Sequence, residues 1–211
     1  MKKIEVIELV KDYLSGGDAP DDVKGRFHDE VIANFIALAF NKAVFMTWSE
    51  AKAYSDYSVL DTWAMPYTIN ISDISSSKGR VLLPFPPVAL PNAMGILQVS
   101  AGTDLTNTFA YRETNANSVF SALEVGAIST KPIFFLEVNT GDEINSHVLR
   151  LEKIPDGCTA VVVKMIVPFD QVDDYTDIVI PAGKEETLIG YVIEIMRSKG
   201  KEDVINDSKA N

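Results

Sequence analysis

The chain has 211 residues and a mass of 23.2 kDa, enough for one large domain or two small ones. Hydrophobic residues make up 46% and charged residues 23% of it, which predicts a folded protein with a proper core rather than a disordered one. The formal net charge of −11 repels phosphates and excludes the basic surface of a protein that reads nucleic-acid sequence.

The first predicted element is an amphipathic helix over residues 2–14. Its apolar residues recur with a helical period, and Glu5 and Glu8 lie on the other face. The two glutamates also interrupt what would otherwise resemble the apolar core of a signal peptide. The sequence contains no uninterrupted run of about 18 apolar residues, so it predicts no membrane span. Gly16 and Gly17 are expected to end the helix.

The second predicted helix, HDEVIANFIALAFNKAVFM over residues 28–46, is the most apolar stretch of the chain. It contains no Gly or Pro, and Glu30, Asn34 and Asn41 form one narrow polar stripe that we expect to face water or a channel. A helix this apolar must be covered on more than one side, by its own chain or by a partner. Residues 47–63 then predict a short helical stretch followed by an irregular, aromatic segment.

From Tyr67 the hydrophobic period changes from 3.6 to 2, as in half-buried strands. About eight short strands without intervening helices predict an antiparallel β-sandwich rather than a parallel α/β fold. Four prolines between Pro84 and Pro91 predict a rigid, extended connection within this block. The predicted strands span residues 67–72, 80–83, 96–100, 109–113, 119–123, 133–138, 147–152 and 158–167.

The chain returns to helix near its end. KEETLIGYVIEIMRSKG predicts an amphipathic helix that Gly200 stops. The predicted fold class is therefore α+β, with amino- and carboxy-terminal helices forming a small helical layer and an inserted antiparallel β-sandwich of about eight strands. The predicted regions are a helical region 1–64, a β-sandwich 65–182, a closing helix 183–200 that packs on 1–64, and a flexible tail 201–211.

Two groups of polar residues are candidates for a catalytic or metal site. Asp142, Glu143 and His147 could act in acid–base chemistry, but they span a predicted hairpin turn and no nucleophile motif accompanies them. The acidic segment 170–177 could hold calcium for a metal-assisted hydrolase, but it lacks the glycine and final glutamate of an EF-hand loop. We therefore predict a protein that is not an enzyme and has no catalytic residues, metal or cofactor.

The single cysteine, Cys158, excludes an intramolecular disulfide. It lies between a Pro-Asp-Gly turn and a valine run, and no cationic residue flanks it closely. It is therefore predicted to be a small buried side chain rather than a reactive thiol.

Three stretches carry a resemblance to a known family. They are IEVIELVKDYLSGGDAPDDVKGRFHDEVIANFIALAF, the proline-framed LLPFPPVALPNAMGILQV, and DIVIPAGKEETLIGYVIEIM at the end. With helices at both termini and an inserted β block, the chain resembles the head-to-tail connector (neck, adaptor or ring) proteins of tailed bacteriophages. It is most similar in kind to the ring proteins of crAss-like short-tailed phages.

The resemblance implies a structural virion protein of the neck or tail, assembled in the host cytoplasm. Such a subunit would form a homo-oligomeric ring, typically twelvefold, that docks below the portal protein and contacts other neck or tail proteins. The ring would continue the channel through which double-stranded DNA passes without specific recognition, and no membrane is involved. The candidate subunit or partner interface consists of aromatic residues in the helical parts: Phe35, Phe45, Trp48, Tyr54, Trp63 and Tyr191.

The sequence leaves a second class of function open. The chain could be a β-sandwich binding module for carbohydrate or peptide, flanked by helices. Its ligand platform would then be formed by exposed aromatic side chains, with Trp48, Tyr54, Trp63 and Tyr111 as candidates.

Overall fold

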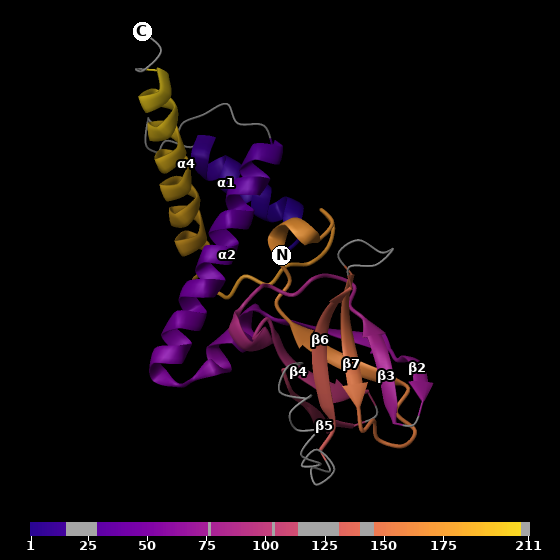
Figure 1. Cartoon of the computed structure of the whole chain (residues 1–211). Helices are drawn as coiled ribbons and strands as arrows, with labels where there is room; N and C mark the ends of the chain where they lie inside the picture. Colours follow the sequence, from indigo (N-terminus) through magenta and orange to yellow (C-terminus); the bar gives the residue numbers. More distant parts are fainter. Residues whose placement is uncertain (16–28, 76, 103, 114–130, 140–145, 208–211) are drawn as a thin grey trace. The chain divides into compact units, whose positions relative to one another are not determined.

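The computed structural model describes residues 1–15, 29–75, 77–102, 104–113, 131–139 and 146–207 (Figure 1). The chain divides into two compact units. We call Met1–Trp63 with Pro168–Asn211 the helical unit, and Ala64–Val167 the β unit. Helices therefore come from both ends of the chain and strands from its middle, which confirms the predicted α+β fold.

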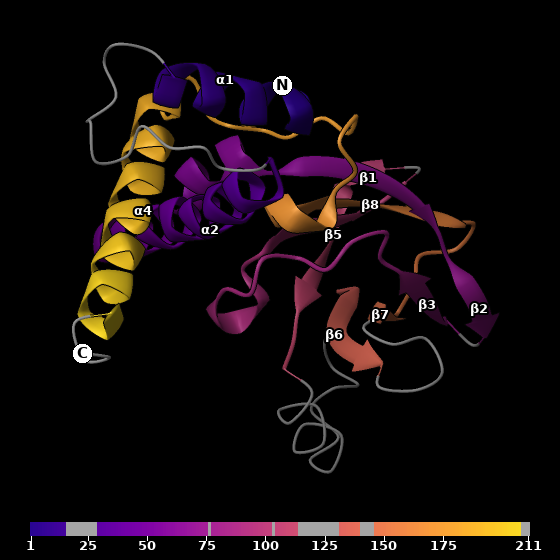
Figure 2. The ribbon, with the colours of Figure 1, turned by 90° about the horizontal axis from the view of Figure 1, so that it is seen from above.

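The helical unit is built around one long helix, α2, which runs from Asp29 to Tyr54. Every other helix that the structure describes in this unit contacts α2, and α4 crosses it (Figure 2). The other helices are α1 (Lys3–Ser15), the short 3₁₀ helices η1 (Tyr57–Trp63) and η4 (Phe169–Gln171), and α4 (Glu185–Asp207).

The predicted end of the central helix at residue 46 is wrong, because α2 continues without a break to Tyr54. It ends where Ser55 adopts a left-handed conformation, with φ of 55°. The backbone N–H of Ser55 donates to Lys52 O at 3.3 Å, and that of Asp56 donates to Ala51 O at 3.0 Å. These two bonds form a Schellman motif, which closes a helix even when the left-handed residue is not glycine.

The core of the helical unit is centred on the face of α2 that carries Ile36, Phe40 and Val44. Ile36, Phe40 and Val44 are at most 1% exposed. The ring of Phe40 meets Trp63 edge-on at 5.4 Å and lies 6.5 Å from the ring of Phe169. Residues distant in sequence thus meet on this face of α2. Phe35, about 140° around the helix from Phe40, is also buried, so α2 is covered on more than one side, as predicted.

The predicted buried faces of the flanking helices are largely confirmed. Val6, Val10 and Leu14 of α1 are buried. On α4 the buried side chains are Leu188, Ile189, Val192 and Met196.

The carboxy-terminal boundaries differ from the prediction in two ways. The helix α4 continues through Gly200 to Asp207, because a glycine lowers helix stability by only about 1 kcal/mol and stops a helix only when it turns left-handed. Residues 168–182 belong to the helical unit rather than to the β block. Their backbone bonds to the start of α1: Lys3 N donates to Thr176 O at 3.1 Å, and Ile178 N donates to Met1 O at 2.7 Å.

In the β unit, eight strands within the described residues form one sheet in the order β1-β8-β4-β5-β6-β7-β3-β2. All neighbouring strands are antiparallel except β5 and β6, which pair in parallel over two residues. The strands are β1 (Met65–Asn70), β2 (Ser72–Ser75), β3 (Lys78–Leu82), β4 (Ile96–Ala101), β5 (Asp104–Tyr111), β6 (Ile133–Asn139), β7 (Ser146–Glu152) and β8 (Ala160–Met165).

Both halves of the sheet contribute to one hydrophobic core. Val161, Val163 and Met165 of β8 are fully buried, and β8 lies between β1 and β4 as a central strand should. Leu149 and Leu151 of β7 belong to the same core. The predicted strand at 119–123 lies outside the described residues, and β2 is a strand that was not predicted.

Candidate interaction surface of the helical unit

The side of α2 that the unit leaves uncovered carries large apolar residues. Val31, Leu38 and Phe45 are 36%, 46% and 50% exposed, and Met46 beside them is 42% exposed. The first three recur every seven residues, the spacing at which residues face a packed neighbouring helix in coiled coils. Exposed apolar side chains in such a row are typical of an interaction surface.

Polar side chains alternate with this row. Asn34 and Asn41 are exposed and also lie seven residues apart. We call Val31, Asn34, Leu38, Asn41 and Phe45 together the α2 stripe. The predicted polar stripe is therefore at the surface, as expected, and the same face also carries the exposed apolar residues Val31, Leu38 and Phe45.

The carboxy-terminal end of the stripe is aromatic and positively charged. The rings of Phe45 and Trp48 lie 5.5 Å apart. The ammonium of Lys52 lies 5.3 Å from the centre of the Trp48 ring. Trp48 is only 9% exposed and packs against Phe45, whereas Phe45 and Lys52 are exposed.

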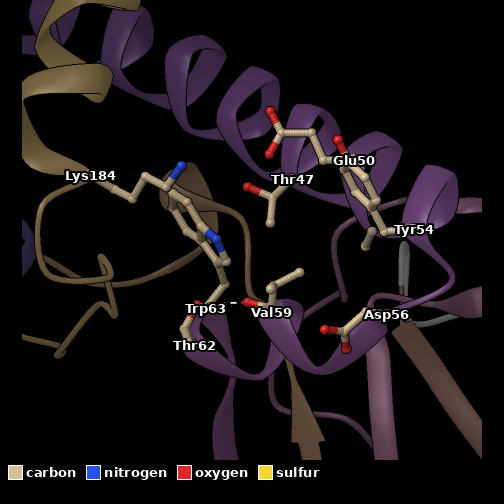
Figure 3. Close-up of a pocket in the computed structure, with 9 residues that line it drawn as sticks. Thr47, Glu50, Tyr54, Asp56, Val59, Thr62, Trp63 and Lys184 are labelled. Atoms are coloured by element: carbon tan, nitrogen blue, oxygen red, sulfur yellow. Dashed lines mark hydrogen bonds between the residues drawn. The ribbon is translucent and has the colours of Figure 1, made fainter.

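The opposite face of α2 contributes to a pocket of about 360 Å³ (Figure 3). Phe45 and Thr47 are two residues apart, about 200° around the helix, so the α2 stripe and the pocket point in opposite directions. The pocket lies between α2, η1 and the residue that precedes α4. Its lining consists of Thr47, Glu50, Ala51, Tyr54, Asp56, Val59, Thr62, Trp63 and Lys184.

The floor of the pocket is apolar and its rim is charged. Ala51 and Trp63 are 2% exposed, whereas Glu50 and Asp56 are exposed carboxylates. The Asp56 carboxylate accepts hydrogen bonds from Ser58 Oγ at 2.6 Å and Ser58 N at 3.0 Å. These bonds favour the ionised form and hold the pKa of Asp56 below its usual value. Asp56 therefore stays ionised to a lower pH than an aspartate without such bonds.

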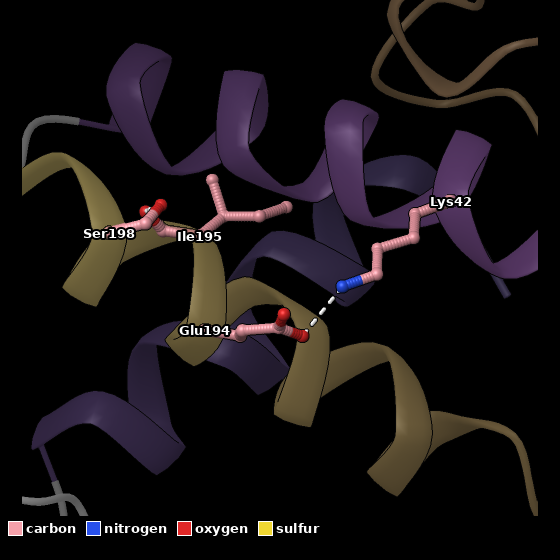
Figure 4. Close-up of polar contacts among 4 residues, drawn as sticks. All are labelled: Lys42, Glu194, Ile195 and Ser198. Atoms are coloured by element: carbon pink, nitrogen blue, oxygen red, sulfur yellow. Dashed lines mark hydrogen bonds and ion pairs between the residues drawn. The ribbon is translucent and has the colours of Figure 1, made fainter.

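A polar contact between Lys42 and Glu194 joins α2 to α4 (Figure 4). Lys42 Nζ lies 2.6 Å from Glu194 Oε2 and 4.6 Å from the centre of the Tyr191 ring. One turn after Glu194 on α4, Ser198 Oγ donates to Ile195 O at 2.8 Å. Tyr191 is thus half-buried against a neighbouring helix of its own chain.

The six predicted interface residues separate into two groups. Phe45 and Tyr54 are exposed, Tyr54 to 84%, and Tyr191 is half-buried. Phe35, Trp48 and Trp63 are covered by their own chain and are corrected from interface to core. Phe45 lies on the α2 stripe, whereas Tyr54 and Trp63 line the pocket on the opposite face.

Leu38, Met46 and the pocket were missed in the sequence. The signal for Leu38 is the seven-residue repeat from Val31 to Phe45, which an all-round apolar helix obscures. Nothing in the local pattern predicts the pocket, because it depends on how η1 folds back against α2.

The acidic segment 170–177 is held against the start of α1. Lys3 Nζ lies 3.5 Å from Asp174 Oδ1 and donates to Val172 O at 2.8 Å. Ile4 N donates to Asp174 O at 3.0 Å. In the part of the chain that the structure describes, no group of three or more His, Cys, Asp or Glu side chains is placed to hold a metal.

The remaining candidates for chemistry belong to the β unit. His147 lies on β7, while Asp142 and Glu143 lie outside the described residues. Cys158 is 3% exposed and belongs to the β-unit core, as predicted. Its Sγ donates to Ala160 O at 3.2 Å.

The β unit presents one of the aromatic residues considered for ligand binding. Tyr111 is 38% exposed, and its ring lies 5.5 Å from that of Phe134. Burial of part of the ring, followed by the nearby charge of Glu113, raises the pKa of Tyr111. Such a single exposed ring is small compared with a platform of several aromatics.

The length and composition of α2 are also those of a helix that could cross a membrane. The segment Glu30–Tyr54 is long and apolar enough to cross a membrane, judged by length and composition alone. However, 56% of its most apolar window is buried inside the protein, which is typical of the core helix of a folded unit. The contacts with the surrounding helices therefore account for its composition.

Comparison with protein-family models, curated proteins and solved structures finds no match for this chain.

Proposed function

We propose that this protein is a structural, ring-forming subunit of a phage head-to-tail connector, which docks below the portal and continues the DNA channel. The observation that carries the proposal is the α2 stripe, with Leu38 and Phe45 about half exposed on the central helix of the unit. A helix that packs its own unit on one face and leaves such side chains outside is suited to subunit contact.

Charge and architecture also support this role. The net charge of −11 suits a channel whose wall must not bind DNA tightly. The chain has helices at both ends and a β unit inserted between them in the sequence, which agrees with the architecture that the connector resemblance implies. A ring of such subunits uses heterologous contacts, in which two different patches meet.

The test is electron microscopy of the purified full chain over a range of concentrations. We expect closed rings with a central opening. A persistent single subunit at every concentration would contradict the proposal, and so would open filaments without rings.

A carbohydrate- or peptide-binding module is the alternative function, and the exposed Tyr111 is the observation that favours it. Its test is binding to immobilised glycans and peptides. Binding that is lost in Tyr111→Ala, by a protein that stays monomeric, would favour the module over the connector.

A further inference from the structure

We infer that neighbouring copies of this chain join through the two opposite faces of α2, with Phe45 of one copy seated in the α2–η1 pocket of the next. This inference rests on the proposed ring, and it names the contact that builds it. The pocket is the one lined by Trp63, Val59 and Tyr54.

The geometry of a ring requires two different patches on each subunit. A heterologous contact closes into a ring only if each subunit presents one surface forwards and its complement backwards. Phe45 and the pocket residues Thr47 and Ala51 lie on opposite sides of the same helix. A single element thus carries both surfaces, so each added copy repeats the same contact.

The shapes of the two surfaces correspond. Phe45 protrudes from the stripe with half of its side chain exposed and rests on Trp48. The pocket of about 360 Å³ has an apolar floor formed by Ala51 and Trp63. Aromatic anchors that enter such apolar pockets are the usual centres of protein interfaces.

The charges of the two surfaces are also complementary. Lys52 lies one heptad after Phe45, is exposed, and is held beside the Trp48 ring. Glu50 and Asp56 are exposed at the rim of the pocket. When Phe45 enters the pocket of the next copy, Lys52 meets a rim with two carboxylates and one cation, Lys184. This pairing favours a second copy over an acidic partner as the occupant.

The contact is tested by complementation between two variants of the full chain. Phe45→Asp removes the protruding ring and keeps the pocket. Val59→Trp fills the pocket and keeps the ring, at a position that is 41% exposed and therefore tolerates a larger side chain. The matched control is Tyr175→Asp, which changes an aromatic residue of the helical unit that is 76% exposed and belongs to neither surface. Circular dichroism establishes that all three variants fold.

Native mass spectrometry then measures assembly of each variant alone and of an equimolar mixture. We expect association at least about tenfold weaker for each interface variant and wild-type rings for Tyr175→Asp. The mixture should give a 1:1 dimer and nothing larger, because only one intact junction remains.

Three outcomes would overturn the inference, and they differ in what they say about the ring. If wild type forms rings and both interface variants do so too, or if the mixture stays monomeric, the contact lies elsewhere and the connector proposal stands. If wild type never exceeds one subunit, both the contact and the proposed function are wrong.

Discussion

Lys42 and Glu194 form an ion pair of 2.6 Å between helices whose residues lie 152 positions apart in the chain. Lys42 also lies over the ring of Tyr191. The pair therefore connects the first and last parts of the helical unit. Its side chains are 37% and 63% exposed, so solvent screens the attraction and the pair contributes little stability.

We expect Glu194→Gln to lower the free energy of unfolding by less than about 1 kcal/mol. Lys42→Ala should cost more, because it also removes the contact with the Tyr191 ring, worth about 0.5–1 kcal/mol at exposed sites. Urea unfolding at low and high salt measures both. A cost of Glu194→Gln that stays the same in about 1 M salt, where charges are screened within about 3 Å, would contradict the interpretation as a surface pair.

Phe35 and Phe45 are two phenylalanines of α2 that differ strongly in burial. Phe35 is 7% exposed and Phe45 is 50% exposed. Phe35→Asp buries an unpaired charge and removes core packing, so it should cost at least about 3–5 kcal/mol and yield insoluble protein. Phe45→Asp should fold normally. Soluble yield and thermal unfolding compare the two, and normal folding of Phe35→Asp would show that this face is not core.

Two glycines differ in the space around them. A Cβ at Gly190, on the exposed side of α4, would meet nothing within 4 Å, so Gly190→Ala should stabilise the protein by about 0.5–1 kcal/mol. A Cβ at Gly95 would lie 2.1 Å from Val88 O, so Gly95→Ala should destabilise it clearly. Denaturant unfolding of both variants checks the opposite signs, and equal effects would contradict the packing described for the β unit.

Asp56 offers a prediction on pH. Because bonds from Ser58 lower the pKa of Asp56 in the folded state, its ionisation stabilises the fold above the unfolded-state pKa, and that stabilisation is lost as the pH falls through the folded-state pKa. Ser58→Ala should raise the pKa of Asp56 towards its usual value. Carboxyl NMR titration measures the shift. An Asp56 that titrates identically in both proteins would show that the bond from Ser58 Oγ does not lower its pKa.

The periodicity of the sequence predicted most elements, and tertiary packing decided the differences. The alternation of Val161, Val163 and Met165 identified β8 as a central strand, because one face had to be buried. The end of α2 was misplaced because it depends on a left-handed serine, Ser55, rather than on a glycine or proline. Residues 168–182 were misassigned because their hydrogen bonds join them to α1, a partner too distant in sequence for a local pattern to show.

The candidate site was predicted only in part. Of the aromatic residues predicted for an interface, Phe45 and Tyr54 are exposed, whereas Phe35 and Trp63 are covered by neighbouring elements of their own chain. In a helix that is apolar almost all round, the sequence does not say which face its own chain buries. The positions of α4, η1 and η4 decide that.

The most direct test of the account is the native mass of the full chain compared with that of Leu38→Asp. Leu38 is 46% exposed at the middle of the α2 stripe, so the substitution should leave the fold and its thermal stability unchanged. The account predicts a ring of defined stoichiometry for wild type and a 23.2 kDa monomer for the variant. Equal assembly of the two proteins, or a wild type that remains monomeric at every concentration, would contradict it.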